Sequence, residues 1–96
     1  MSFAKQFRSV FSKVILHQAT INPGSLADGA GETVSVTVPG AALGDTVLCG
    51  PGTDVLDVLF SASVVAANTV EIRFQNESTG TRDIASSTWN LTVLGR

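Results

Sequence analysis

Hydrophobic and polar residues alternate with a period of two in the central stretch of the sequence, residues 32–50. The alternating residues are Thr33, Val34, Ser35, Val36, Thr37 and Val38. This period is typical of a strand with one face in solvent and the other on a core. Pro39-Gly40 ends the strand, because proline lacks an N–H for the ladder and glycine accepts turn conformations. A second extended run, 46–49, ends at Gly50-Pro51-Gly52. The stretch therefore predicts two strands joined by a loop.

The same alternation predicts four further strands, at residues 14–22, 55–65, 69–75 and 86–94. The apolar residues expected to face the core are Val14, Leu16, Ala19, Ile21, Leu56, Val58, Phe60, Ala62, Val64, Val70, Ile72, Phe74, Trp89, Leu91 and Val93. In the first strand this requires a change of phase after Leu16. Residues 66–68 predict a hairpin turn, and Leu26 and Ile84 are expected to anchor two polar loops. About six strands with regular turn signals predict an all-β fold, a single small β-sandwich or jelly-roll-like domain.

The first 14 residues follow a different pattern. Phe3, Phe7, Val10, Phe11 and Val14 recur at intervals of three and four, which places them on one stripe of a short helix or an adaptable arm. A helix of this length is marginal in water by itself. It needs a surface to pack on, either its own body, a sister subunit or another protein. We therefore divide the chain into an N-terminal attachment arm, 1–14, and a β-sandwich body, 15–96.

Charge is scarce and unevenly distributed. Charged residues make up 15% of the chain, against about 25% on average, so we expect a body that buries surface in an oligomer or covers it with small polar residues. Lys5, Arg8 and Lys13 precede the first acid, Asp28, and the rest of the chain is acidic. A basic arm on an acidic body suggests different partners for the two parts. Three cations are too few to predict a nucleic-acid partner.

The sequence predicts neither a membrane span nor a disulfide. No apolar run approaches the roughly 20 residues that a spanning helix needs. Lys13 interrupts the apolar residues 10–16, which argues against a secretory signal, although the acid-free amphipathic stretch 3–13 is compatible with an import signal. The single cysteine, Cys49, excludes an intrachain disulfide.

No catalytic or metal-binding set is evident. Cys49 and His17 are the only residues of their kinds, and a nucleophilic pair between them requires only proximity in the fold. The position of Cys49 at the end of an apolar strand instead indicates a small buried hydrophobe. Asp45, Asp54 and Asp57 lie near glycines but lack the spacing of a calcium loop. We interpret them as turn residues that accept bonds from the backbone, and expect no cofactor and no enzymatic activity.

Two long stretches resemble a known domain. The runs VTVPGAALGDTVLCGPG and FSASVVAANTVEIRFQNESTGTRDIASSTWNLTVL are similar to a small β-domain of virion proteins in tailed bacteriophages. That domain forms the knobs of head and tail fibres, and occurs alone in head decoration, or cement, proteins. The resemblance covers roughly residues 19 to 94.

The resemblance implies a homotrimeric structural protein on the outer surface of a phage head, made in the host cytoplasm and bound to the major capsid protein. A fibre needs a shaft, and only about twenty residues lie outside the matched region, so the decoration role is favoured. The arm residues expected to bind the capsid are Phe3, Lys5, Phe7, Arg8 and Phe11, with the aromatic rings in apolar grooves and the cations against acids. A receptor- or glycan-binding knob that uses the loop 76–87 is the alternative, and a thiol enzyme a distant third.

Overall fold

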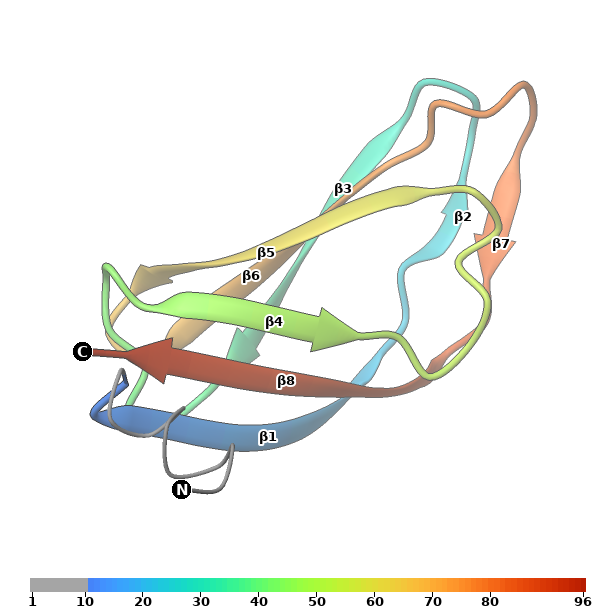
Figure 1. The fold of residues 1–96 in the computed structure, drawn as a ribbon. Helices are drawn as coiled ribbons and strands as arrows, with labels where there is room; N and C mark the ends of the chain where they lie inside the picture. Colours follow the sequence, from blue (N-terminus) through green and yellow to red (C-terminus); the bar gives the residue numbers. More distant parts are fainter. Residues whose placement is uncertain (1–10) are drawn as a thin grey trace.

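The structure, a computed structural model, describes residues 11–96, and these residues fold into β-strands and loops (Figure 1). The strands are β1 (Lys13–Ile21), β2 (Gly24–Leu26), β3 (Gly31–Thr37), β4 (Thr46–Gly50), β5 (Leu59–Ala66), β6 (Thr69–Gln75), β7 (Arg82–Ile84) and β8 (Ser87–Gly95). The predicted all-β class is therefore confirmed. Residues 11–96 form eight strands rather than about six, because the short β2 and β7 lie in segments that were expected to be loops.

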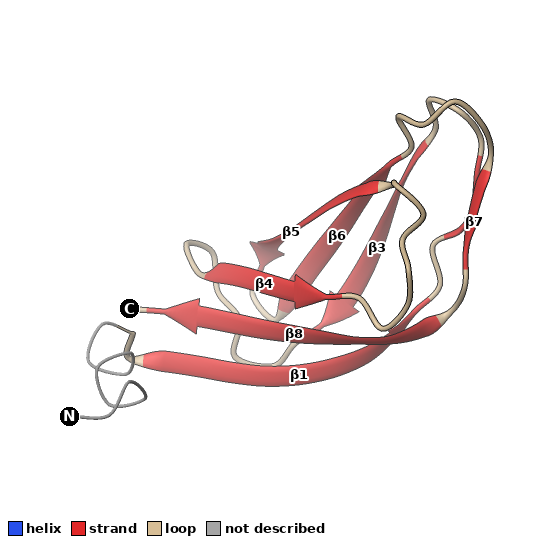
Figure 2. Ribbon diagram, turned by 45° about the vertical axis from the view of Figure 1, so that its right-hand side comes forward, coloured by secondary structure: helices blue, strands red, loops and turns tan. Residues whose placement is uncertain are grey.

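All strand pairs are antiparallel and form three sheets. The orders are β1-β8-β4, β3-β6-β5 and β2-β7. The two three-stranded sheets cover each other, and β4 lies beside β5 where they meet (Figures 1 and 2). The small β2-β7 sheet forms the end of the molecule away from the C-terminus (Figure 1). The result is a sandwich-like body with extents of 47 × 28 × 20 Å over its Cα atoms.

The core lies between the two larger sheets and is supplied mainly by their central strands, β6 and β8. Val70, Ile72 and Phe74 from β6, and Trp89 and Val93 from β8, are fully buried, as the alternation predicted. The Trp89 ring stands edge-on to Phe74 and to Phe60, with ring centroids 5.5 and 5.1 Å away. Edge-to-face pairs of this kind add about 0.5–1.5 kcal/mol each beyond the area that they bury.

The prediction for the first strand was right that Ala19 and Ile21 face the core and wrong for Val14 and Leu16. β1 pairs with β8 without interruption, from Lys13 opposite Gly95 to Ile21 opposite Ser87. A continuous ladder keeps the period of two, so no change of phase occurs. Ile15 and Ala19 pack against the core, whereas Leu16 points outward and is 79% exposed. Val14 also lies on the outer side.

The predicted strand 55–65 begins later than expected, at Leu59. Leu56 and Asp57 adopt positive φ values of 55° and 69°, which break the extended conformation. The Asp54 carboxylate accepts a hydrogen bond from the Leu56 N–H at 2.9 Å, the turn role predicted for this acid. Leu56 was expected to face the core and is instead 37% exposed.

Asn76 joins the two segments that enclose the β2-β7 sheet. Its buried side-chain amide donates hydrogen bonds to the carbonyl groups of Leu26 at 2.8 Å and Gly80 at 2.9 Å, and its Oδ1 accepts one from the Ser78 hydroxyl at 2.6 Å. Its backbone N–H donates to Ala30. The Asn76 side chain thus bonds to polar groups of both loops. Its own donor and acceptor groups are satisfied at the same time, which the burial of an amide requires.

Replacing Asn76 by Asp tests this role. The substitution keeps the shape of the side chain but replaces the donating nitrogen by an oxygen that faces carbonyl oxygens. We therefore expect the free energy of unfolding to fall by about 2–4 kcal/mol. The free energy of unfolding in urea at pH 7 measures the change. Asn90→Asp, on an exposed side chain, is the control and should change it by less than about 0.5 kcal/mol. Equal losses in the two variants would show that the Asn76 network does not hold the loops.

Candidate protein-binding face

The outer faces of the two larger sheets differ in chemistry. The face of β3-β6-β5 carries charged and polar side chains that bond across the strands. Arg73 donates a hydrogen bond to the Thr33 hydroxyl at 3.2 Å, and the Ser35 hydroxyl donates to Glu71 at 3.4 Å. This is the arrangement expected of a sheet face in water.

The outer face of β1-β8-β4 carries no charged side chain along its three strands. We call this surface the uncharged face; its outward side chains are Val14, Leu16, Gln18, Thr20, Thr46, Leu48, Thr88, Asn90 and Thr92, together with Leu94, which is buried. Leu16, Thr92 and Leu48 form one row across the strands, and the two leucines are 79% and 55% exposed. Exposed leucines on a charge-free sheet face are typical of a surface that contacts another protein.

Three hollows lie on this face or at its end near Phe11 and Arg96. One of about 540 Å³ lies between β1 and β8, where Gln18 donates a hydrogen bond to Asn90 at 2.8 Å. A second, of about 500 Å³, is lined by residues that include Leu43, Leu94 and Arg96. A third, of about 310 Å³, is lined by Phe11, Ser12, Val14 and Leu16. The uncharged face is therefore uneven, with apolar side chains along the edges of the hollows.

Phe11 is the one residue of the arm predicted to bind the capsid that lies within the described range. It is half-buried and lines two of the three hollows, so the arm joins the body at the uncharged face. Phe3, Lys5, Phe7 and Arg8 lie outside the described residues. The ladder with β8 begins at Lys13, so the last two residues assigned to the arm, 13 and 14, take part in the sheet.

A small network holds the start of β1 next to this face. The Lys13 ammonium forms an ion pair with Asp45 and donates a hydrogen bond to the Gly40 carbonyl at 3.0 Å. Asp45 also accepts a bond from the Ala42 N–H at 3.0 Å, which confirms its predicted turn role. A Cβ at Gly95 would lie 2.6 Å from Asp45 Oδ1, so a larger residue there would require the side chains of the pair to shift. The hydrogen bond from Lys13 is the main cause that lowers the pKa of Asp45 below its ordinary value.

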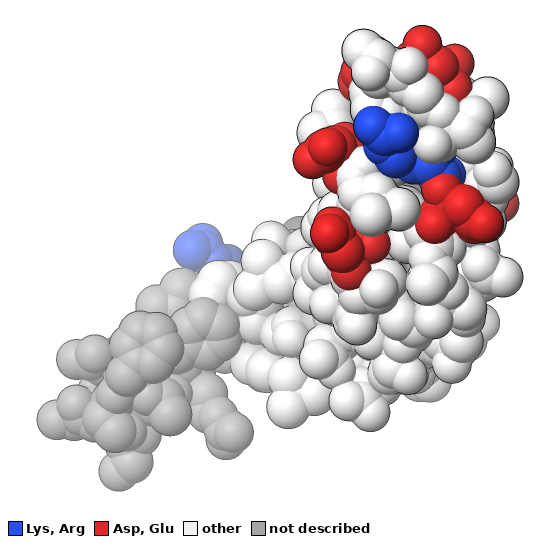
Figure 3. Space-filling model, turned by 90° about the vertical axis from the view of Figure 1, so that its right-hand side faces the viewer, with Lys and Arg blue, Asp and Glu red and all other residues white. Residues whose placement is uncertain are grey.

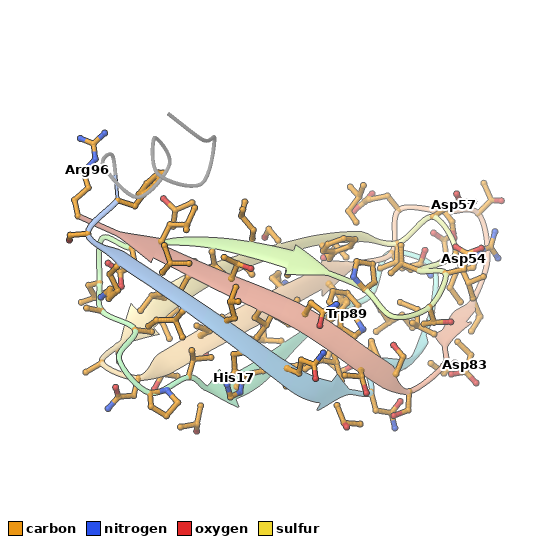
Figure 4. The ribbon with its side chains drawn as sticks, turned by 60° about the horizontal axis from the view of Figure 1, so that its bottom comes forward. His17, Asp54, Asp57, Asp83, Trp89 and Arg96 are labelled. Carbon is orange, nitrogen blue, oxygen red and sulfur yellow. The ribbon has the colours of Figure 1, made fainter. Side chains whose placement is uncertain are left out.

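The two ends of the molecule differ in charge. Asp54, Asp57 and Asp83 lie at the end formed by β2, β7 and their loops, while Arg96, the last residue, lies at the opposite end (Figure 4). Figure 3 views the β2-β7 end and shows acidic side chains around it, with some basic atoms between them. The acidic end and the uncharged face therefore present different surfaces to their surroundings.

Cys49 and His17 lie on either side of Leu91 and form no catalytic pair. Both residues are opposite Leu91, one on β4 and the other on β1, so two strand spacings of about 4.8 Å separate their backbones. The Cys49 side chain packs against the core, as predicted, and desolvation raises its pKa. A raised pKa disfavours the thiolate that a nucleophile needs.

The described residues offer little else for chemistry. No group of three His, Cys, Asp or Glu among residues 11–96 could hold a metal ion. The same part of the chain contains no helix long and apolar enough to cross a membrane. Asn76-Glu77-Ser78 matches a glycosylation signal, but the Asn76 side chain is buried and fully hydrogen-bonded.

Comparisons with known proteins identify no relative. No family model, no curated protein and no solved structure matches the chain. The functional assignment therefore depends on the residues and on the geometry described above.

The Lys13–Asp45 pair predicts a pH dependence of stability. Because the pKa of Asp45 is lowered in the folded state, the ionised carboxylate stabilises the fold above the ordinary pKa of about 3.8, and this contribution is lost as the pH falls through the folded-state value. We expect Asp45→Asn to destabilise the protein at pH 7, and the difference from the wild type to shrink below pH 3.8. Urea unfolding between pH 7 and pH 2.5 measures both. In a Lys13→Met background the pH dependence of the difference should shrink to the part that the Ala42 N–H bond supplies; an unchanged pH dependence there would show that Lys13 is not the main partner.

Proposed function

We propose that this chain is a structural protein of a tailed-phage virion, a decoration or cement protein that binds the shell of the major capsid protein. The observation that carries the proposal is the uncharged face, which begins beside Phe11, at the end of the body where the arm joins it. A protein that attaches to a large assembly needs such a surface, because apolar and aromatic contacts supply most of the energy of protein binding.

The distribution of charge suggests how the molecule is oriented on its partner. Phe11 and Arg96 line the same hollow of about 500 Å³, and Asp54, Asp57 and Asp83 lie at the end opposite Arg96 (Figure 4). Contact through the terminal end would leave the acidic end in solvent, where like charges keep particles soluble and separate. The proposed location is therefore the outer surface of the head, with several copies, three in the assembly that the resemblance implies, on each binding position.

A receptor- or glycan-binding knob is the second candidate. The observation in its favour is the acidic β2-β7 end, where the loop after Asn76 exposes Glu77 and Asp83. A glycan array tests this role. Specific retention of one glycan class by the full chain, lost in Glu77→Ala with Asp83→Ala, would replace the decoration role by the knob role.

The arm carries the proposed attachment, so replacing its aromatic residues should weaken binding. For Phe3→Ser with Phe7→Ser we expect at least about tenfold weaker binding, because aromatic anchors commonly contribute more than 1.4 kcal/mol at an interface. The measurement is co-sedimentation of the full chain with shells of the major capsid protein of the phage that encodes it.

The matched control is Leu59→Ser, which removes an exposed leucine from the opposite sheet, where Leu59 is 61% exposed. Its binding should equal that of the wild type. Wild-type binding by the arm variant would contradict attachment through Phe3 and Phe7, and absence of binding by the wild type would contradict the decoration role itself.

A further inference from the structure

β1 is a long edge strand with one side of its backbone unpaired by any described strand. It is the outermost strand of its sheet and pairs with β8 alone. Its nine residues run from Lys13 to Ile21 without a bulge. The other side of the strand therefore presents a row of N–H and C=O groups, which is a template for another strand.

Every other edge in residues 11–96 carries one of the features that limit pairing with a further strand. β4 lies beside β5 of the opposite sheet (Figure 1). β5 contains a bulge between Val64 and Ala66. β3 carries the charged Glu32 on its inward side and is followed by Pro39, and β2 and β7 are three residues long.

β1 has none of these features between Val14 and Ile21. The segment contains no proline and no Asp, Glu, Lys or Arg, and Lys13 at its start is engaged with Asp45. Two apolar side chains, Val14 and Leu16, flank the edge on its outer side, where they are 38% and 79% exposed. The hollow of about 310 Å³ that they line with Phe11 and Ser12 lies along this edge.

We infer that β1 pairs with β1 of a second copy of this chain across a twofold axis, so that the β1-β8-β4 sheet continues from one copy into the next; a threefold assembly would need a further contact. A copy is the occupant that the charge distribution favours. All eight acids of the chain lie after residue 27, so the bodies of two copies repel each other over most of their surface. The uncharged face and the β1 edge of one copy can approach the same surfaces of another copy without bringing like charges together. Backbone pairing extends the ladder, and Leu16 becomes covered at the junction.

This contact is separate from the proposed attachment to a shell, because it joins copies of the chain and requires no arm residue before Phe11. It supplies a specific site for the self-association that the low charge content predicts. Pairing at an exposed sheet edge is a common way in which proteins add a strand.

Two leucines of the uncharged face provide a matched test. Leu16 on β1 and Leu48 on β4 lie in the same row and flank the same Thr92, but only Leu16 borders the unpaired edge. Both are exposed, so a lysine at either position leaves the core intact, which circular dichroism and thermal unfolding verify. The full chain, Leu16→Lys and Leu48→Lys are compared by light scattering and by amide hydrogen exchange.

The expected result is a discrete oligomer for the wild type and for Leu48→Lys, and a shift of at least tenfold in the dissociation constant toward the monomer for Leu16→Lys. Amides of residues 13–21 should exchange slowly in the oligomer and faster in the dissociated variant. A monomeric wild type would overturn the inference, as would an oligomer that Leu16→Lys leaves intact. Slow exchange in β1 that appears only after addition of capsid shells would show that the shell, and not a second copy, pairs with this edge. If both variants bind the shell as strongly as the wild type does, the decoration role is unaffected.

Discussion

The rest of the structure depends on the unbroken antiparallel ladder between β1 and β8. Nine consecutive residues of β1 lie opposite nine residues of β8, and β8 also pairs with β4. Because a strand alternates its side chains strictly, this ladder determines which residues enter the core and which lie outside. Trp89, Leu91 and Val93 enter it from β8, and Ile15, Ala19 and Ile21 follow from β1. The outward Leu16 is a direct consequence.

The uncharged face follows from the same ladder. β1, β8 and β4 have apolar or uncharged polar residues at every outward position, while the opposite sheet places Arg73 and Glu71 in water. Two faces of one small body thus differ in how readily they release water. The proposed contacts with a shell and with a second copy both use the side that loses less hydration energy on burial.

The acidic end is held by a different interaction. Asn76 bonds the segment after β2 to the segment after β6, and this allows two loops rich in small polar residues to form the β2-β7 pair beneath them. The buried Leu26 and Ile84 supply the apolar part of that end. Its shape therefore depends on one amide and two apolar anchors, whereas the body depends on the two packed sheets.

The sequence by itself determined the all-β class, the hairpin at residues 66–68 and most of the core. These features depend on alternation and on turn residues, which are local properties of the chain. The structure buries the predicted core residues Val70, Ile72 and Phe74 and the two loop anchors Leu26 and Ile84. Asp45 and Asp54 have the turn roles that were predicted for them. The predicted arm contacts with a capsid remain a prediction.

The tertiary structure decided the orientation of β1, the late start of β5, the β2-β7 pair and the uncharged face. Val14-Ile15-Leu16 is apolar at every position, so alternation cannot assign its faces, and only pairing with β8 does so. The alternation places Leu56 in a strand, but in the structure the turn at Asp54 gives Leu56 a positive φ. Nothing in the polar sequence around Asn76 indicates that its side chain is buried. Long-range pairing makes each of these choices, because it joins residues that lie far apart in the chain.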